Sequence, residues 1–308
     1  MKELIQFKHN DFTLPGYVWK KENGNYKAIV LIIHGMVEHI ARYDNFAIFL
    51  MENDFIVYGY DQRGHGLSVQ NKEEVGHIEA KDGFKALVND VNYVVNELKK
   101  QYPNLPLFIL GHSMGSFIAQ AYLIDYNPSI NGIILSGSNG NPGKIINIGI
   151  YLSNLMVNLF GSNYRSKFIY NLVFGAYNKR CKTPKNRPNW LSRDEKIVQA
   201  YYEDEYCGKV CSASFFRDFF KGLKHISKNY DKISPKIPIL IISGTDDPVG
   251  RYGKGIVQLS NDLPTIKDKL TIEDICNVVE SLGGVRKGEN KDYIIYSSIC
   301  HNLDADDG

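Results

Sequence analysis

The feature that most constrains how this 308-residue chain can fold is a series of apolar runs separated by segments with helical spacing. The runs are AIVLIIHG from residue 28, FIVYGYDQRGHG from 55, PLFILG from 106, INGIILSG from 130 and IPILIISG from 237. Apolar runs without polar alternation are typical of strands that are buried on both faces. The intervening segments 43–53 and 84–102 have the spacing of amphipathic helices. The alternation predicts an α/β fold with a mostly parallel sheet between layers of helices, preceded by an antiparallel pair within 4–21.

The alternation of apolar runs and helical segments stops between residues 138 and 234. No run there is typical of a buried strand, and the segment has helical spacing and many aromatic residues. We expect this segment to be a helical cap inserted into the sheet domain. The predicted domains are therefore a core formed by residues 1–137 and 235–308, and a cap formed by residues 138–234.

Composition excludes several classes of function. The 36 basic and 34 acidic residues leave a net charge of +2, which gives no electrostatic case for binding nucleic acid. The N-terminus lacks the apolar region of a signal peptide, and no window is long enough for a membrane span. Five scattered cysteines, with no histidine near Cys207 and Cys211 in the sequence, favour free thiols in a reducing cytoplasm over a zinc site.

The strongest chemical motif is Gly-His-Ser-Met-Gly at 111–115, which lies between a predicted strand and a predicted helix. In that context the pattern G-x-S-x-G forms a sharp turn that presents a serine nucleophile. Ser113 is therefore the predicted nucleophile. A flexible turn that happens to contain a serine is the alternative interpretation.

A serine nucleophile needs a base, and the base needs an acid that orients it. On sheets that carry this motif the chain order is serine, acid, histidine. His301 is the only histidine that follows every other component, and it ends the apolar run YIIYSSICH. Asp246 and Asp247 follow the last predicted strand, and the residues alone leave the choice between them open.

Acyl transfer also requires donors for the oxyanion of the tetrahedral intermediate. We expect these donors to be the backbone N–H groups of Met36 and Met114. Gly35 allows the first loop to approach closely. Gly35 and His112 are also selected as substrate contacts.

Four motifs together, HGMVEHIARY, DQRGHGLS, GHSMG and SGTDDPVGRYGKG, resemble those of monoacylglycerol lipases and the related bacterial lysophospholipases. The resemblance covers most of the chain. It implies the α/β-hydrolase fold with a helical cap, of the serine aminopeptidase S33 type. It also selects Asp247 as the acid, and it implies that His34, Glu38, His39, Arg42 and His65 support the pocket rather than perform chemistry.

The C-terminus departs from the pattern of that family. The segment between the acid and His301 contains an additional helix-like piece at 271–284, and only NLDADDG follows the histidine. A catalytically impaired hydrolase-fold binding protein is therefore one alternative function. A peptidase and an acyltransferase that use the same triad are two others.

The leading interpretation is a serine hydrolase of single-acyl lipids, either monoacylglycerol or lysophospholipid, that needs no metal or organic cofactor. The apolar segment 145–160 of the predicted cap could line an acyl-chain tunnel or rest on a membrane surface. Ile145, Leu152 and Leu155 are the residues selected there as substrate contacts. The expected location is the cytoplasm, with transient contact to a membrane surface through the cap.

Overall fold

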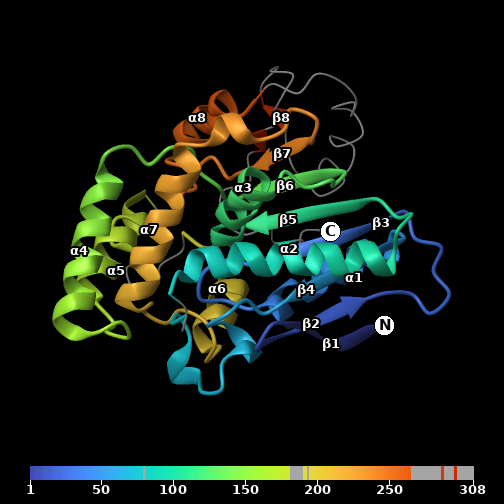
Figure 1. The fold of residues 1–308 in the computed structure, drawn as a ribbon, viewed down its shortest axis with the longest axis horizontal. Coiled ribbons are helices and arrows are strands. Elements are labelled where there is room, and N and C mark those ends of the chain that lie inside the picture. Colours follow the sequence, from blue (N-terminus) through green and yellow to red (C-terminus); the bar gives the residue numbers. More distant parts are fainter. Residues whose placement is uncertain (79–80, 181–189, 193, 265–285, 288–294, 297–308) are drawn as a thin grey trace.

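A seven-stranded sheet forms the centre of the protein in a computed structural model that describes residues 1–78, 81–180, 190–192, 194–264, 286–287 and 295–296 (Figure 1). The strand order is β1-β2-β4-β3-β5-β6-β7, in which β1 and β2 are antiparallel additions to a parallel sheet. The strands of this sheet are β1 (Lys2–His9), β2 (Phe12–Trp19), β3 (Ala28–Ile33), β4 (Phe55–Tyr60), β5 (Leu107–His112), β6 (Gly132–Ser136) and β7 (Ile239–Ile242). A separate antiparallel pair consists of β8 (Arg286–Lys287) and β9 (Ile295–Tyr296).

Helices cover both faces of the sheet. The α-helices are α1 (Asp44–Glu52), α2 (Gly83–Gln101), α3 (Met114–Tyr126), α4 (Ile145–Phe160), α5 (Lys167–Phe174), α6 (Glu195–Glu203), α7 (Ala213–Ser227) and α8 (Lys254–Asp262). Short 3-10 helices are η1 (Ile40–Tyr43), η2 (Gly66–Ser68), η3 (Lys72–Glu74), η4 (Tyr177–Arg180) and η5 (Tyr230–Lys232). None of the helices in these described ranges has the length and apolarity to cross a bilayer.

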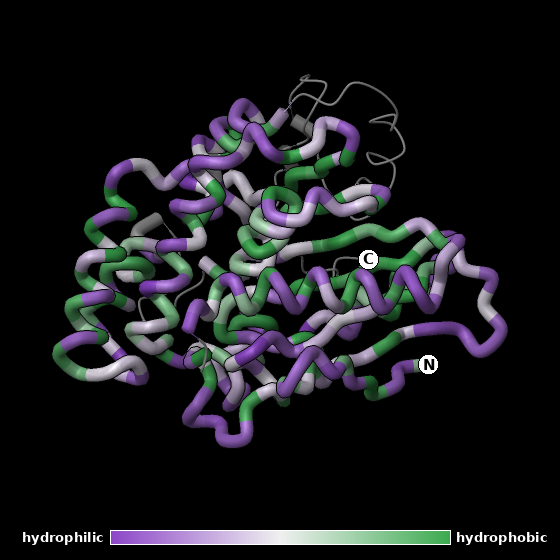
Figure 2. Tube along the Cα trace, in the orientation of Figure 1, coloured by the Kyte–Doolittle hydropathy of each residue, from purple (hydrophilic) through white to green (hydrophobic). Residues whose placement is uncertain are grey.

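Strand β3 shows why the central runs are continuously apolar. All six of its residues are buried, and successive side chains of a strand point to opposite faces. Leu31 and Ile33 join the cluster that contains α2 and α3, whereas Val30 and Ile32 join the smaller cluster that contains Ala47 of α1. Figure 2 shows the result, with hydrophobic residues concentrated in the central strands and polar residues alternating along α2.

The segment between β6 and β7, which we call the inserted segment (residues 138–234), carries α4 to α7. In Figure 1, α4 and α5 stand beside the sheet domain, and α7 lies between them and the rest of the molecule. Helix α7 packs against α4 and also against α2 and α3. Phe216 and Phe220 of α7 are buried in the main core cluster, so α7 is the base on which the outer helices rest.

The sequence predictions for the sheet are confirmed. The five apolar runs contain β3 to β7, the N-terminal pair is β1 and β2, and the described helices of 138–234 occur where no strand was expected. His301 and the helix-like piece 271–284 lie outside the described residues.

Candidate active site

The turn between β5 and α3 holds Ser113 in a conformation that few residues adopt, with φ 51° and ψ −116°. Its two glycines are required by close backbone packing. A Cβ atom on Gly111 would lie 2.6 Å from the carbonyl oxygen of Gly115, and one on Gly115 would lie 2.0 Å from that of Ile33. The Ser113 N–H donates to the Ser136 carbonyl of the neighbouring strand at 2.8 Å. These contacts hold the serine at the end of a buried strand and at the N-terminus of α3, which is the geometry of a nucleophile turn.

The loop after β3 lies directly beside this turn. A Cβ atom added to Gly35 would be 3.3 Å from the Cβ of Ser113. Met114 is the first residue of α3, so no helical carbonyl satisfies its N–H. The amide of Gly35 already donates to Glu38, which leaves Met36 as the next amide of the loop. The structure thus places Gly35, the neighbour of Met36 in the chain, beside Ser113, the neighbour of Met114.

Glu38 is the buried residue that holds this loop. One of its carboxylate oxygens accepts from the Gly35 N–H and, at 2.8 Å, from the Tyr43 hydroxyl, and the other pairs with Arg42. Burial raises the pKa of Glu38, but the Arg42 guanidinium and nearby histidines outweigh burial and lower the pKa to about 2. Glu38 is therefore ionised at neutral pH and acts as an acceptor at the base of the loop.

Val37, in the same loop, has a strained backbone with φ 47°. For a β-branched residue this region is a genuine outlier, because the branched side chain crowds the backbone. Such a conformation costs on the order of 1–3 kcal/mol and persists only where neighbouring groups enforce it.

The loop after β7 separates the two candidate acids. Asp247 is fully buried, whereas Asp246 is exposed. The Asp247 carboxylate accepts from the Val249 N–H at 2.8 Å and from the Ser243 hydroxyl at 3.2 Å. The fold therefore distinguishes two adjacent aspartates that the sequence left equivalent on physical grounds.

Three other histidines named in the sequence analysis, His34, His65 and His112, are buried. His34 accepts from the Gln62 N–H at 3.0 Å through Nε2, and its Nδ1 contacts the Gly35 carbonyl at 2.8 Å. Burial, followed by the neighbouring His65 ring, lowers the pKa of His34 to about 3, and burial lowers that of His65 to about 4. His112 contacts the Ser136 hydroxyl at 3.1 Å.

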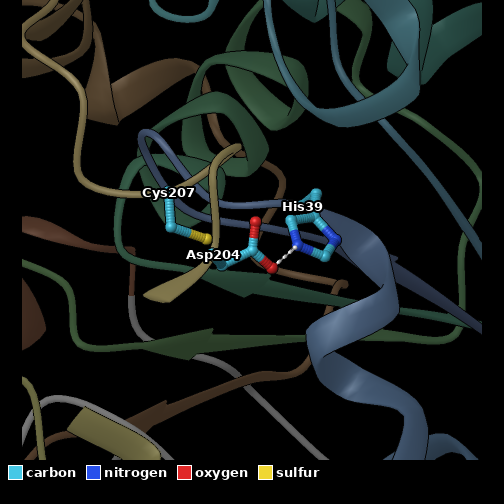
Figure 3. Close-up of side chains that lie close together, drawn as sticks. All are labelled: His39, Asp204 and Cys207. Carbon is cyan, nitrogen blue, oxygen red and sulfur yellow. Dashed lines mark hydrogen bonds and ion pairs between the residues drawn. The ribbon is translucent and has the colours of Figure 1, made fainter. Parts of the chain in front are cut away.

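His39 lies close to two side chains of the inserted segment, Asp204 and Cys207 (Figure 3). The candidate ligand atoms of these three residues lie within 4.8 Å of one another, and their types suit a transition metal. However, the His39 Nε2 is already bonded to the Asp204 carboxylate at 2.8 Å. Burial raises the pKa of the Cys207 thiol, which disfavours the thiolate that a metal requires. The cluster is best described as a hydrogen bond that joins the core to the inserted segment, beside a buried thiol.

The apolar residues selected on α4 lie at the surface. Ile145 is 68% exposed, Leu155 is 36% exposed and Leu152 is half-buried. A cavity of about 10 Å³ does lie next to Met114, between α2 and α7, but this volume holds only about one water molecule. The described residues thus favour an outward-facing role for α4 over the lining of a preformed tunnel.

Comparison with known proteins identifies the family. The sequence matches the family described as serine aminopeptidase, S33, over residues 24–273. The chain belongs to this family. It is therefore a serine hydrolase of the α/β-hydrolase fold, as the resemblance in its sequence implied.

Curated relatives of this hydrolase include the monoglyceride lipase of Rattus norvegicus, which is 36% identical over 74% of this chain and 67% of the relative. The human monoglyceride lipase is 29% identical over the same shares. Among solved structures, a carboxyl esterase from Bacillus coagulans superposes with a TM-score of 0.79 at 24% identity, over 91% of this chain and 96% of that one. A monoglyceride lipase from Saccharomyces cerevisiae superposes with a TM-score of 0.65 at 20% identity, over 86% of this chain and 83% of that one. The two structures show the shared fold.

Sequence reasoning missed one group of residues at this site. Tyr201, Asp204 and Gly208 of the inserted segment all contact the loop that follows β3. They are more than 160 positions from that loop in the chain, so no local pattern connects them to it. The strained backbone of Val37, which Tyr201 and Gly208 contact, also leaves no signature in a single sequence.

Proposed function

We propose that this hydrolase cleaves the ester bond of single-acyl lipids, such as monoacylglycerols or lysophospholipids. The observation that carries the proposal is the strained turn of Ser113, packed directly against the loop of Gly35 and Met36. In the proposed site, the serine hydroxyl lies beside two backbone amides that donate hydrogen bonds to the oxyanion of a tetrahedral intermediate. The similarity to monoglyceride lipases supports a lipid ester as the substrate class.

In the proposed mechanism, the Ser113 hydroxyl attacks the ester carbonyl while His301 takes its proton. The N–H groups of Met36 and Met114 stabilise the oxyanion. His301 then protonates the leaving alcohol, and water releases the fatty acid from the acyl-enzyme by the reverse sequence. Asp247 orients His301, and its full burial and two hydrogen bonds support this assignment.

We propose further that the inserted segment 138–234 acts as a cap that meets a membrane surface transiently. Helix α4 carries no charged residue in its sixteen positions. The exposed large apolar side chains of α4, α5 and their connection are Ile145, Ile148, Tyr151, Leu155, Leu159, Phe160, Tyr164, Phe168 and Leu172. Exposed apolar side chains on neighbouring helices fit contact with lipid, from which a single-acyl substrate would be drawn.

The test is the hydrolysis of a monoacylglycerol, a lysophosphatidylcholine and a nitrophenyl ester series by wild type and variants. Ser113→Ala, Asp247→Ala and His301→Ala should each lower kcat by roughly 10³-fold or more. Matched controls are Ser129→Ala, Asp246→Ala and His225→Ala, which change residues of the same types outside the proposed triad. Full activity in His301→Ala would refute the assignment of the base, and an inactive wild type would favour a binding protein.

Substrate preference follows from the same assay. Faster hydrolysis of the monoacylglycerol or the lysophospholipid would select between the two lipid classes. Cleavage of aminoacyl arylamides in preference to every ester would favour the peptidase alternative.

A further inference from the structure

The inserted segment contacts the loop after β3 at the strained residue. The Val37 carbonyl accepts from the Gly208 N–H at 3.0 Å and from the Tyr201 hydroxyl at 3.3 Å. Two positions along the chain, His39 bonds to Asp204 at 2.8 Å, and Figure 3 shows this bond joining the two parts of the fold. Both hydrogen bonds to the Val37 carbonyl thus come from the inserted segment.

Two further contacts join the same parts. The Arg42 guanidinium lies 4.9 Å from the centre of the Tyr201 ring, a distance typical of a cation–π contact. Arg42 also pairs with Glu38, the residue that accepts from the Gly35 N–H. The α6 region is therefore connected both to the strained carbonyl and to the carboxylate that holds the base of the loop.

We propose that Tyr201, Asp204 and Gly208 together form a positioning element for the oxyanion hole. Fixing the Val37 carbonyl fixes the backbone of the loop on one side of Met36, and Glu38 fixes it on the other side at Gly35. Without the inserted segment, Val37 relaxes toward a negative φ and the Met36 amide turns away from the position of the oxyanion. The inference rests on the proposed function, and it makes catalysis depend on the seating of the inserted segment. Tyr201 and Asp204 act through the loop and do not touch the substrate.

Asp204→Ala tests this coupling because it removes the hydrogen bond to His39 and leaves the active-site side chains unchanged. The variant should lower kcat for a short soluble nitrophenyl ester by about ten-fold or more, while KM changes by less than about two-fold, because a displaced donor weakens binding of the transition state alone. The matched control is Glu205→Ala, which removes a neighbouring surface pair with Lys72 and should leave kcat unchanged.

A second background separates positioning from loss of stability. Glycine adopts a positive φ without strain, so Val37→Gly reduces the need for an external restraint. The kcat loss caused by Asp204→Ala should therefore shrink to about three-fold or less in the Val37→Gly background, because coupled residues are not additive. Equal losses in both backgrounds would show that Asp204 acts only on stability and would overturn the inference.

The remaining outcomes are also informative. An active wild type with no loss of kcat in Asp204→Ala overturns the inference and leaves the proposed function standing. An inactive wild type overturns both. If Asp204→Ala does not fold, Tyr201→Phe replaces it, since this variant removes only the hydroxyl that bonds to Val37, and a kcat loss of about three-fold supports the same coupling.

Discussion

Two buried histidines, His34 directly after β3 and His65 in the loop after β4, have ring centres 5.3 Å apart. Burial lowers the pKa of both, with the neighbouring ring as a further cause for His34, to about 3 and about 4. The folded protein therefore keeps both rings neutral at pH values where the unfolded chain protonates them. Because the unfolded state binds more protons below about pH 6.5, acidification removes stability.

The pH dependence gives a prediction for one residue. Because His65 stays neutral in the folded protein, lowering the pH from 6.5 to 5 should reduce the free energy of unfolding by about 2 kcal/mol. His65→Asn retains a donor near the Arg63 carbonyl, which His65 Nδ1 contacts at 2.9 Å, and removes the titration. Urea unfolding at several pH values should show that the variant loses less stability on acidification than wild type. Parallel curves for the two proteins would contradict this explanation.

At the scale of elements, α4 combines a narrow buried side with a broad apolar exposed side. Ile146, Gly149 and Ser153 are its buried residues, and the small Gly149 allows Phe220 of α7 to pack closely. Ile150 and Met156 pack partly against the core, whereas the large apolar residues that are exposed are Ile145, Ile148, Tyr151, Leu155, Leu159 and Phe160. This distribution explains why helical spacing alone did not show whether α4 lines an internal tunnel or meets lipid.

The exposed side of α4 supplies a prediction about membrane binding. The triple variant Ile148→Ser, Leu155→Ser and Leu159→Ser should reduce co-sedimentation with phosphatidylcholine vesicles by at least about ten-fold. It should leave hydrolysis of a short soluble ester unchanged, because these side chains point away from the core. Leu4→Ser is the matched control, since Leu4 is 61% exposed on β1. Equal vesicle binding by all three proteins would exclude this surface as the lipid contact.

At the scale of the whole molecule, the inserted segment and the sheet domain share one hydrophobic core. Phe216 is fully buried, and Phe215, Phe219 and Phe220 are nearly so, against α2 and α3. An inserted segment packed in this way cannot be removed without exposing the apolar surface of α2 and α3 that it covers.

Phe216→Ala should therefore destabilise the entire protein by about 3–5 kcal/mol, the usual cost of emptying an aromatic site in a core. Phe168→Ala, at a residue that is 59% exposed on α5, should change stability by less than about 0.5 kcal/mol. Chemical denaturation measures both, with probes in the sheet domain and in the inserted segment. Separate transitions for the two parts would contradict a shared core.

The sequence by itself determined the sheet and the place of the sharp turn that holds Ser113. Continuous apolar runs are typical of strands buried on both faces, as in β3. The two glycines near Ser113 are needed because other backbone atoms occupy the space that a Cβ atom would take. These are local requirements, so a single chain displays them directly.

Only the tertiary structure decided which contacts join distant parts of the chain. It buried Asp247 and exposed Asp246, although the two are adjacent and chemically alike. It also placed Tyr201 and Gly208 on the carbonyl of Val37, and thereby held that residue in a conformation its own side chain opposes. Burial and imposed strain depend on neighbours far away in the sequence, and for that physical reason no local pattern reveals them.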